Sequence, residues 1–542
     1  MMNTNQKIDP SISHNDKKFF STPKEKAFTI FLGLLMLFQL LTYIFLLKDT
    51  SIDNDDMCQL TVSIASPLSR IMTLLLETDN NPPLFTLLAA LWVRMVPYGS
   101  AWLKLLSQIF LVLATGLLGR IGYRYGSFMA GIITAVFGAT STLLVYCCAD
   151  AFRPYGLLFL VGTISLHAYL YRREHQENVT SLIYYGISVF LLAFTHYFGI
   201  LTCLALFFYD VLLFFCKKNS FKTSMKILLS YIGAGICYIP WGIRVMQVTL
   251  AKAGSFWPQI PEWKNIYTNC YSKYFDTSIN VLVMLVFLGY LAAYLCKNHL
   301  YQVHQKATHQ NNKADAPKHK DTPHYLWGTF TYEALGVCLF VPFVVTMIDF
   351  LYSKYLNPAG SMWVERYFIV VYPYSFLLIG ISWSYVYHLV TRTMKSKLPQ
   401  LFLISQALGL LLLTGFLVLQ GVQFVQTSQY IGSRIEQPFQ QACEYLVQQD
   451  DFFDDTTGFL PTFTHQKVSY HYFFSKHDQI DVPSFHWIAH PLENDHVLDD
   501  YNTVYLLEIS TELDEHTSAL LQKDFTCVDA QGDIALTKWV RK

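Results

Sequence analysis

The stretch SIDNDDMCQLTVSIASPLSRIMTLLLETDNNPPLFTLLAALWVRMVPYG, residues 51–99, follows the first long apolar segment of the chain. Three of its acids, Asp53, Asp55 and Asp56, stand within a few residues of the end of that segment. Two prolines, Pro82 and Pro83, precede its last apolar run. Acids placed directly after an apolar segment of spanning length, and followed by amphipathic runs, predict a site at a membrane–water boundary.

The composition of the chain is typical of a membrane protein. Of its 542 residues, 53% are hydrophobic and 14% are charged, whereas soluble domains carry about 25% charged residues. Several apolar windows exceed the roughly 18 residues that cross the hydrocarbon core of a bilayer. The formal net charge is +0, so we expect no nucleic-acid partner. The 17 histidines follow no metal-ligand spacing such as HExxH. We therefore expect an all-α polytopic membrane protein.

Eleven apolar runs are interpreted as membrane spans. They are residues 27–47, 101–119, 127–146, 154–171, 181–195, 198–216, 224–248, 279–296, 326–352, 367–390 and 401–425. The run 82–96 is shorter and contains Arg94, and it begins with prolines, whose missing N–H groups cost nothing in the first turn of a helix. If this run is an interfacial helix that does not cross the membrane, most basic loop residues lie on the same side of the membrane as the N-terminus. The positive-inside rule makes that side the cytoplasm.

This topology predicts a multi-pass protein of the plasma membrane with three regions. Residues 1–26 form a cytoplasmic tail, residues 27–425 the membrane domain, and residues 426–542 an extracytoplasmic domain. Within the membrane domain, residues 48–100 form a large outer loop that carries the catalytic acids. The polar residues 297–325 form a cytoplasmic linker loop.

The C-terminal region has the composition of a soluble domain. Residues 439–448 are expected to be helical. Residues 502–508 and 534–540 are rich in β-branched and aromatic side chains, which favours strands. We therefore expect a small α/β domain, in which we identify no nucleophile or metal constellation.

Six motifs follow one another along the chain. They are Asp55-Asp56, NNPPLFTLLAALWVRMVPYG (80–99), WLKLLSQIFLVLATGLLGRIGYRYG (102–126), ADAFRPYGLLFLV (149–161), FTHYFGIL (194–201) and ERYFIVVYPYSFLLIG (365–380). In their order and spacing, from about residue 27 to residue 380, the chain resembles the integral-membrane glycosyltransferases of the GT-C fold that use a polyprenyl-phosphate sugar donor. It is most similar to the bacterial branch akin to protein O-mannosyltransferases and aminoarabinose transferases (glycosyltransferase family 39-like).

The chain departs from the pattern of this family at three places. The usual Asp-Glu of the first loop is Asp55-Asp56, and the usual His before the two prolines is Asn81. The Glu that commonly stands two residues before the second-loop Arg is replaced by Ala151, with Asp150 one position earlier. The first-loop carboxylate is therefore kept, whereas the second-loop acid is displaced.

The chemistry of such a transfer explains why acids and arginines are needed together. The leaving group in such a transfer is the lipid phosphate, which departs with a stable negative charge. The reaction therefore needs a general acid less than glycoside hydrolysis does, which uses two carboxylates. The site must instead supply a base for the acceptor proton and cations for the phosphate. Aspartate, with an unperturbed pKa of about 3.9, is ionised near neutrality. The resemblance implies that Asp55 is this base and that the reaction inverts the anomeric centre.

The predicted catalytic residues are Asp55 and Asp56. For Asp53 and Asp56, a cap or first-turn acid of a helix is an equal alternative. The triplet Asp53-Asn54-Asp55 leaves a divalent cation open as a further alternative. We otherwise expect no required cofactor and no metal ligands.

The predicted substrate-binding residues are Asp53, Asp79, Arg153, Tyr155, His196 and Arg366. Arg153 begins a span, where it either reaches the lipid head groups or holds the donor phosphate, which the planar guanidinium matches. Arg366 pairs with Glu365 or contacts the phosphate, and we favour the contact. Packing is favoured over sugar stacking for Tyr155. His196, at a turn between two apolar helices, is either a satisfied buried histidine or a donor to the phosphate.

The predicted function is a hexosyl- or pentosyltransferase that works on the outer face of the membrane. Its partners would be a polyprenyl-phosphate sugar donor, an acceptor glycan, lipid or protein with a free hydroxyl, and membrane lipids. The alternative is a transporter or flippase of lipid-linked sugars, which would place its ionisable groups near the bilayer midplane. A non-catalytic scaffold that displays the C-terminal domain is the third interpretation, and it would need no convergence of acids and arginines.

Overall fold

The computed structural model describes residues 22–48, 50, 52, 54–78, 81–97, 99–176, 178–251, 260–267, 329–397, 399–433, 439–462, 470, 474, 486–488, 492, 496–507, 515–531 and 536–542. The predicted span 279–296 and the predicted linker 297–325 lie outside these residues.

Within the described residues, eight helices are long and apolar enough to cross a membrane. They are Pro23–Leu46, Ser100–Tyr125, Phe128–Ala149, Tyr197–Phe215, Phe221–Arg244, Thr331–Leu356, Glu365–His388 and Gly409–Gly432. Two further predicted spans, 154–171 and 181–195, form the helices α8 (Tyr155–Glu174) and α9 (Val179–Thr195). The prediction of an all-α polytopic membrane protein with a small C-terminal α/β domain is confirmed.

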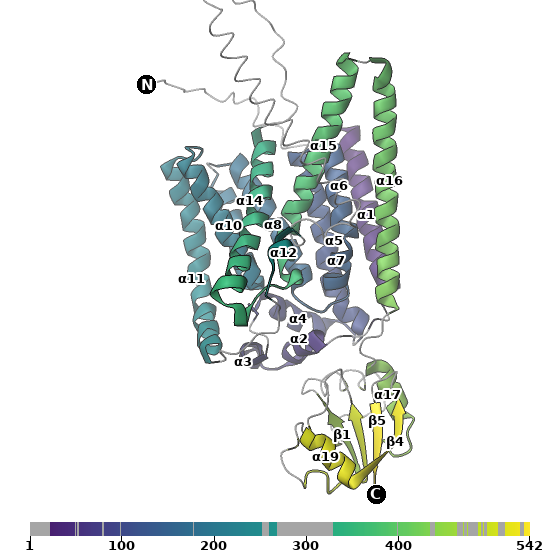
Figure 1. The fold of residues 1–542 in the computed structure, drawn as a ribbon. Coiled ribbons are helices and arrows are strands. Elements are labelled where there is room, and N and C mark those ends of the chain that lie inside the picture. Colours follow the sequence, from purple (N-terminus) through teal and green to yellow (C-terminus); the bar gives the residue numbers. More distant parts are fainter. Residues whose placement is uncertain are drawn as a thin grey trace, which may run out of the picture.

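The long helices stand side by side in one bundle (Figure 1). Their labels are α1 (Pro23–Leu46), α5 (Ser100–Tyr125), α6 (Phe128–Thr140), α10 (Tyr197–Phe215), α11 (Phe221–Ala251), α14 (Thr329–Leu351), α15 (Tyr372–Lys397) and α16 (Pro399–Gly432). The C-terminal domain lies beyond one end of this bundle (Figure 1), which we call the domain end. The opposite end is called the far end.

Three short helices cover the domain end, where the sequence predicts a loop with interfacial helices. They are α2 (Asn54–Ile64), α3 (Leu68–Thr78) and α4 (Leu84–Met95), and they lie next to the C-terminal domain in Figure 1. The guanidinium of Arg94 in α4 donates to the carbonyl oxygens of Ser63, at 3.0 Å, and Ala65, at 2.8 Å. Because the last carbonyls of a helix have no partner within it, Arg94 caps α2 and fastens α4 to it. The run 82–96 is thus a short helix at the end of the bundle and not a span, as predicted.

Small residues let the helices of the bundle approach closely. A Cβ added at Gly122 of α5 would lie 3.0 Å from the carbonyl oxygen of Ala130 in α6. A Cβ added at Gly156 of α8 would lie 2.8 Å from the carbonyl oxygen of Ser107 in α5. Because lipid gives apolar helices no solvent-driven reason to associate, such backbone contacts carry much of the packing.

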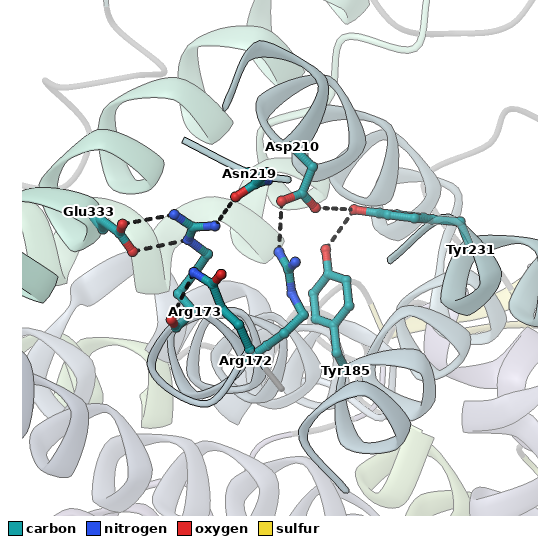
Figure 2. A network of polar contacts seen from close by, with 8 residues as sticks. Arg172, Arg173, Tyr185, Asp210, Asn219, Tyr231 and Glu333 are labelled. Carbon is teal, nitrogen blue, oxygen red and sulfur yellow. Dashed lines mark hydrogen bonds and ion pairs between the residues drawn. The ribbon is translucent and has the colours of Figure 1, made fainter. Parts of the chain in front are cut away.

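A buried polar network joins five helices at the far end (Figure 2). The Arg172 guanidinium lies 2.7 Å from a carboxylate oxygen of Asp210, with its carbon 4.9 Å from the ring centroid of Tyr169 and 4.4 Å from that of Tyr185. Arg173 forms a two-pronged ion pair with Glu333, at 2.8 and 3.0 Å. The other members of the network are Asn219 and Tyr231.

This network changes how two of the basic residues are interpreted. Arg172 and Arg173 lie between the predicted spans 154–171 and 181–195, so the predicted topology places them in a cytoplasmic loop. Both side chains are buried, and Asp210 and Glu333 neutralise them. The two arginines therefore join helices within the protein in addition to marking one side of the membrane.

In the part of the C-terminal domain that the structure describes, a five-stranded mixed sheet is accompanied by the helices α17 (Phe439–Val447) and α19 (Glu515–Asp524). Its strands are β1 (Thr457–Pro461), β2 (His486–Trp487), β3 (Thr503–Leu507), β4 (Phe525–Gln531) and β5 (Leu536–Arg541), in the spatial order β2-β1-β3-β5-β4. Strand β1 runs parallel to β2 and β3, and β5 runs antiparallel to β3 and β4. The predicted helix and strands are found as α17 (Phe439–Val447), β3 and β5, whereas β1, β2, β4 and α19 (Glu515–Asp524) were not predicted.

Candidate functional site

One carboxylate and two guanidinium groups meet at the domain end. Asp55 lies in the first turn of α2, and its Oδ2 accepts a hydrogen bond from Nη2 of Arg366 at 2.8 Å. Nη2 of Arg153 lies 4.0 Å from the same Oδ2, and its Nη1 donates to the Asp55 carbonyl oxygen at 2.9 Å. The Asp55 side chain is 40% exposed, whereas that of Arg153 is 8% exposed. The carboxylate is thus open to solvent on one side and neutralised on the other.

Different parts of the chain supply these three residues. Arg153 belongs to the turn before α8, and Arg366 belongs to the 3-10 turn Glu365–Val371 before α15. Both turns end where a membrane helix begins, so each arginine is held by a long, packed helix. In the structure Arg366 pairs with Asp55, and its favoured role, a contact with the donor phosphate, stays a prediction.

Asp56 has a different environment from that of Asp55. Its side chain is buried, and its Oδ1 accepts a hydrogen bond from the backbone N–H of Phe152 at 2.8 Å. The carboxylate thereby fastens the first loop to the segment that carries Arg153. Asp56 also lies in the first turn of α2, which is the structural alternative raised for it. Its catalytic role stays a prediction.

His196 lies in the turn between α9 and α10, buried beside the two arginines. Its Nδ1 accepts the backbone N–H of Phe198 at 3.2 Å, so His196 caps α10. Burial lowers the pKa of His196 to about 3, and the charges of Arg153 and Arg366 act in the same direction. The ring is therefore neutral near pH 7. With Nδ1 accepting, the proton is assigned to Nε2, which makes that atom a hydrogen-bond donor.

Tyr155 packs beside the site, and its role in substrate binding stays a prediction. It is the first residue of α8 and is buried. The guanidinium carbon of Arg366 lies 5.5 Å from the centroid of its ring, which is within the range of a cation–π contact. The rings of Tyr155 and Tyr367 stack with their centroids 6.3 Å apart. Tyr155 thus orients the arginine that contacts Asp55.

Two predicted site residues, Asp53 and Asp79, lie outside the described residues. The triplet Asp53-Asn54-Asp55 left a divalent cation open as an alternative. Of its two carboxylates, only that of Asp55 lies among the described residues. In the part of the chain that the structure describes, no group of three or more His, Cys, Asp or Glu residues is arranged to hold a metal ion.

Lys104 is not among the predicted site residues, and Asp150 is predicted only as an acid one position away from the usual family Glu. Nζ of Lys104, in the second turn of α5, lies 2.7 Å from Oδ1 of Asp150 and 2.8 Å from Oγ1 of Thr50. Lys104 is fully buried. A lysine inside an otherwise apolar run is the signal that could have pointed to it, because an intramembrane charge needs a partner.

Comparison with solved structures identifies the fold. Two crystal structures of ArnT from Cupriavidus metallidurans, one bound to undecaprenyl phosphate and one in the apo state, each match with a TM-score of 0.54. The sequence identities are 10% for the lipid-bound structure and 9% for the apo structure. The two matches cover 94% and 95% of this chain, and each covers 98% of the ArnT chain. No protein-family model and no curated protein matches the chain.

An oligosaccharyltransferase from Archaeoglobus fulgidus, tethered to an acceptor peptide, matches with a TM-score of 0.46 and 11% identity. That match covers 88% of this chain and 69% of the other. The likeness to ArnT shows that the chain has the GT-C fold, in agreement with the sequence prediction.

Proposed function

We propose that this protein transfers a sugar from a polyprenyl-phosphate-linked donor to a hydroxyl group of an acceptor, with inversion, at the domain end of the bundle. The observation that carries the proposal is the meeting of Asp55 with Arg366 and Arg153 at the ends of membrane helices. ArnT, whose fold this chain shares, has been crystallised with undecaprenyl phosphate bound. That complex supports a lipid phosphate as the carrier of the donor sugar.

The two arginines would hold the donor phosphate. A guanidinium matches a phosphate with two parallel hydrogen bonds, and such charge-assisted bonds are the strong ones. As the bond from the anomeric carbon to the phosphate oxygen breaks, the leaving lipid phosphate gains negative charge. Fixed cations then stabilise the transition state more than the ground state, which is the requirement for catalysis.

Asp55 would be the base, and the ion pairs suggest how it becomes active. Without substrate, its carboxylate shares its charge with Arg366 and Arg153. A bound phosphate competes for the same guanidinium groups, so the carboxylate is released from them and can accept a hydrogen bond from the acceptor hydroxyl. The acceptor oxygen then attacks the anomeric carbon opposite the phosphate, and its proton goes to Asp55. One C–O bond forms as another breaks, which inverts the centre.

The neighbouring residues fit this division of roles. Tyr155 lies against Arg366, and neutral His196 offers a hydrogen-bond donor without a further positive charge. Asp53 and Asp79 remain proposed substrate contacts of the same loop. The acceptor is proposed to be a glycan, lipid or protein hydroxyl, and the sugar a hexose or pentose. The proposal requires no cofactor and leaves a divalent cation at the acid triplet as an open alternative.

Transport of a lipid-linked sugar is the competing function. The described ion pairs of the membrane region lie toward the two ends of the helices, at Asp55 and Asp150 on one side and at Asp210, Glu333 and Glu174 on the other. Transporters instead place ionisable groups near the midplane. This distribution favours transfer chemistry at one end.

The deciding experiment uses purified protein in lipid nanodiscs with a radiolabelled polyprenyl-phosphate sugar and a panel of acceptors. Transfer of label by the wild type, and its loss in Asp55→Asn, would support the proposal. Asp499→Asn, an exposed change in the C-terminal domain, is the matched control and should transfer normally. Movement of the donor across liposome membranes without any transfer would overturn the proposal in favour of the transporter.

A further inference from the structure

Three buried polar side chains lie on one face of α5. They are Lys104, Ser107 and Gln108, whose spacing of three and four residues puts them on the same side of a helix. All three bind the segment 149–153, which leads into α8. Their bonds run from Lys104 Nζ to Asp150 Oδ1 at 2.7 Å, from Ser107 Oγ to the Arg153 carbonyl oxygen at 3.3 Å, and from Gln108 Nε2 to the Ala149 carbonyl oxygen at 3.1 Å.

The segment held by α5 is the one that carries the candidate site. Its Arg153 contacts Asp55, and its Phe152 N–H is bound by Asp56. Just after it, the absence of a side chain at Gly156 lets α8 approach the backbone of Ser107. A shift of this segment along α5 would therefore move the Arg153 guanidinium relative to Asp55.

Lys104 differs from the other two because it also reaches the first loop. Its Nζ lies 2.8 Å from Oγ1 of Thr50, which precedes α2 and its two acids. One ammonium group thus bridges the segment before Asp55 and the segment before Arg153. Packing alone would be better served by an apolar residue, because a buried charge carries a desolvation cost that its partners only partly repay.

We propose that Lys104 is a positioning residue for the transfer reaction. Its ammonium group fixes the first loop to the segment 149–153, so that Arg153 stands beside Asp55 where the donor phosphate binds. The proposal rests on the proposed function for its catalytic consequence. The geometric part, that Lys104 determines how well Arg153 can hold a lipid phosphate, can be tested by binding alone.

Removing the ammonium group also has an electrostatic consequence. The Asp150 side chain is 24% exposed and is one residue before Ala151, in the same turn as Arg153. Without Lys104 this carboxylate loses its cationic partner. The Asp150 carboxylate, three residues before Arg153, would then repel an anionic donor. This repulsion would add to the loss of binding that a misplaced Arg153 causes.

The test measures two quantities in Lys104→Met, which keeps the length of the side chain without its charge. One is binding of undecaprenyl phosphate to the protein in nanodiscs, and the other is kcat and KM for the donor. We expect binding to weaken about tenfold and kcat/KM to fall about 10²-fold, the scale of a small misplacement of a binding group. Thr50→Val, which removes the hydroxyl contact and little volume, should show a smaller loss in the same direction.

Two further variants separate positioning from mere stability. Adding Asp150→Asn to Lys104→Met removes the stranded charge, so the double variant should bind the lipid phosphate no worse than the poorer single variant, because the two residues act as a unit. Arg172→Met breaks an equally buried ion pair at the far end. It should lower thermal stability while the folded protein keeps its KM and kcat.

These measurements distinguish failure of the positioning role of Lys104 from failure of the proposed transferase function. If the wild type transfers sugar and folded Lys104→Met keeps both its lipid-phosphate affinity and its kcat/KM, the positioning role is wrong and the transferase stands. If the wild type binds undecaprenyl phosphate and transfers nothing, the transferase fails, and weakened binding in Lys104→Met still supports the positioning role. If the wild type does not bind this lipid, both proposals fall.

Discussion

Nη2 of Arg366 lies 2.8 Å from Oδ2 of Asp55, although 311 positions separate the two residues in the sequence. The contact joins the first loop of the membrane domain to the turn before α15. Asp55 and a donor phosphate are both anions that pair with a guanidinium, so the two would compete for Arg366. The first two predictions below rest on this pair.

The two arginines are expected to bind the donor. Arg153→Ala and Arg366→Ala should each weaken binding of a polyprenyl-phosphate donor by roughly 1.5–3 kcal/mol, the range of a hydrogen bond to a charged group. Substitution by lysine should restore only part of the donor affinity, because lysine lacks the planar guanidinium group that forms two parallel hydrogen bonds with a phosphate. Titration in nanodiscs measures the effect. Arg124→Ala, at the far end, is the control. Unchanged affinity in both site variants would remove these arginines from the proposed site.

Asp55→Asn should abolish most transfer while leaving the fold intact. Loss of a positioned base costs about 10²–10⁴-fold in rate. Because the carboxylate no longer competes for Arg366, affinity for the lipid phosphate should not fall. Single-turnover assays and lipid binding test the two parts separately.

Asp56→Asn is the neighbouring control for the base. An amide oxygen can still accept the Phe152 N–H, so this variant should lose less activity than Asp55→Asn. If Asp56→Asn loses activity and Asp55→Asn keeps it, the base has been assigned to the wrong residue.

The topology makes the two ends of the bundle accessible from opposite sides. In a cysteine-free background, Lys218→Cys, exposed at the far end between α10 and α11, should be labelled only from the cytoplasm. Lys542→Cys, at the end of the C-terminal domain, should be labelled from outside intact cells. Labelling of both from one side contradicts the predicted orientation.

The buried pair at the far end should matter for stability and not for chemistry. Arg172→Met leaves Asp210 buried without its cation, which typically costs 3–5 kcal/mol when a single partner is removed. Arg172→Met/Asp210→Leu should recover much of that loss, since an apolar pair has no desolvation cost. Thermal unfolding in detergent reports the difference. A double variant less stable than the single variant would show that the pair contributes net stability.

The C-terminal domain should lose stability at acid pH through Asp451. Burial raises the pKa of this carboxyl, but the hydrogen bonds from Lys538 and Tyr505 outweigh burial and lower the pKa below its usual value. A carboxyl with a lowered folded pKa contributes stability that is present above its unfolded value, about 3.9, and is lost as pH falls through the folded pKa. Asp451→Asn should therefore unfold at a lower temperature at pH 7, and its deficit should shrink below about pH 4. The exposed Asp500→Asn should follow the wild type throughout.

The sequence alone determined the class of the protein and the places where chemistry could occur. Many apolar runs of about 18 residues or more in one chain indicate membrane spans, so length and composition predicted the helices of the bundle. The distribution of basic residues among the loops distinguished the run 82–96, which forms α4, from a span. Four candidate residues could be selected because each is a polar group next to an apolar run, where an ionisable side chain is costly unless it has a partner. They are Asp55, Arg153, His196 and Arg366.

Only the tertiary structure decided which of these groups meet. Asp55 and Asp56 are adjacent in sequence, yet one faces two arginines and the other holds a backbone N–H, because successive residues of a helix point in different directions. A lysine within an apolar run signals that Lys104 needs a partner, but the sequence does not say which one. The spacing of Lys104, Ser107 and Gln108 becomes meaningful only when segment 149–153 lies against that face of α5. Such pairing depends on helix packing across many residues of chain, and no local pattern in the sequence encodes it.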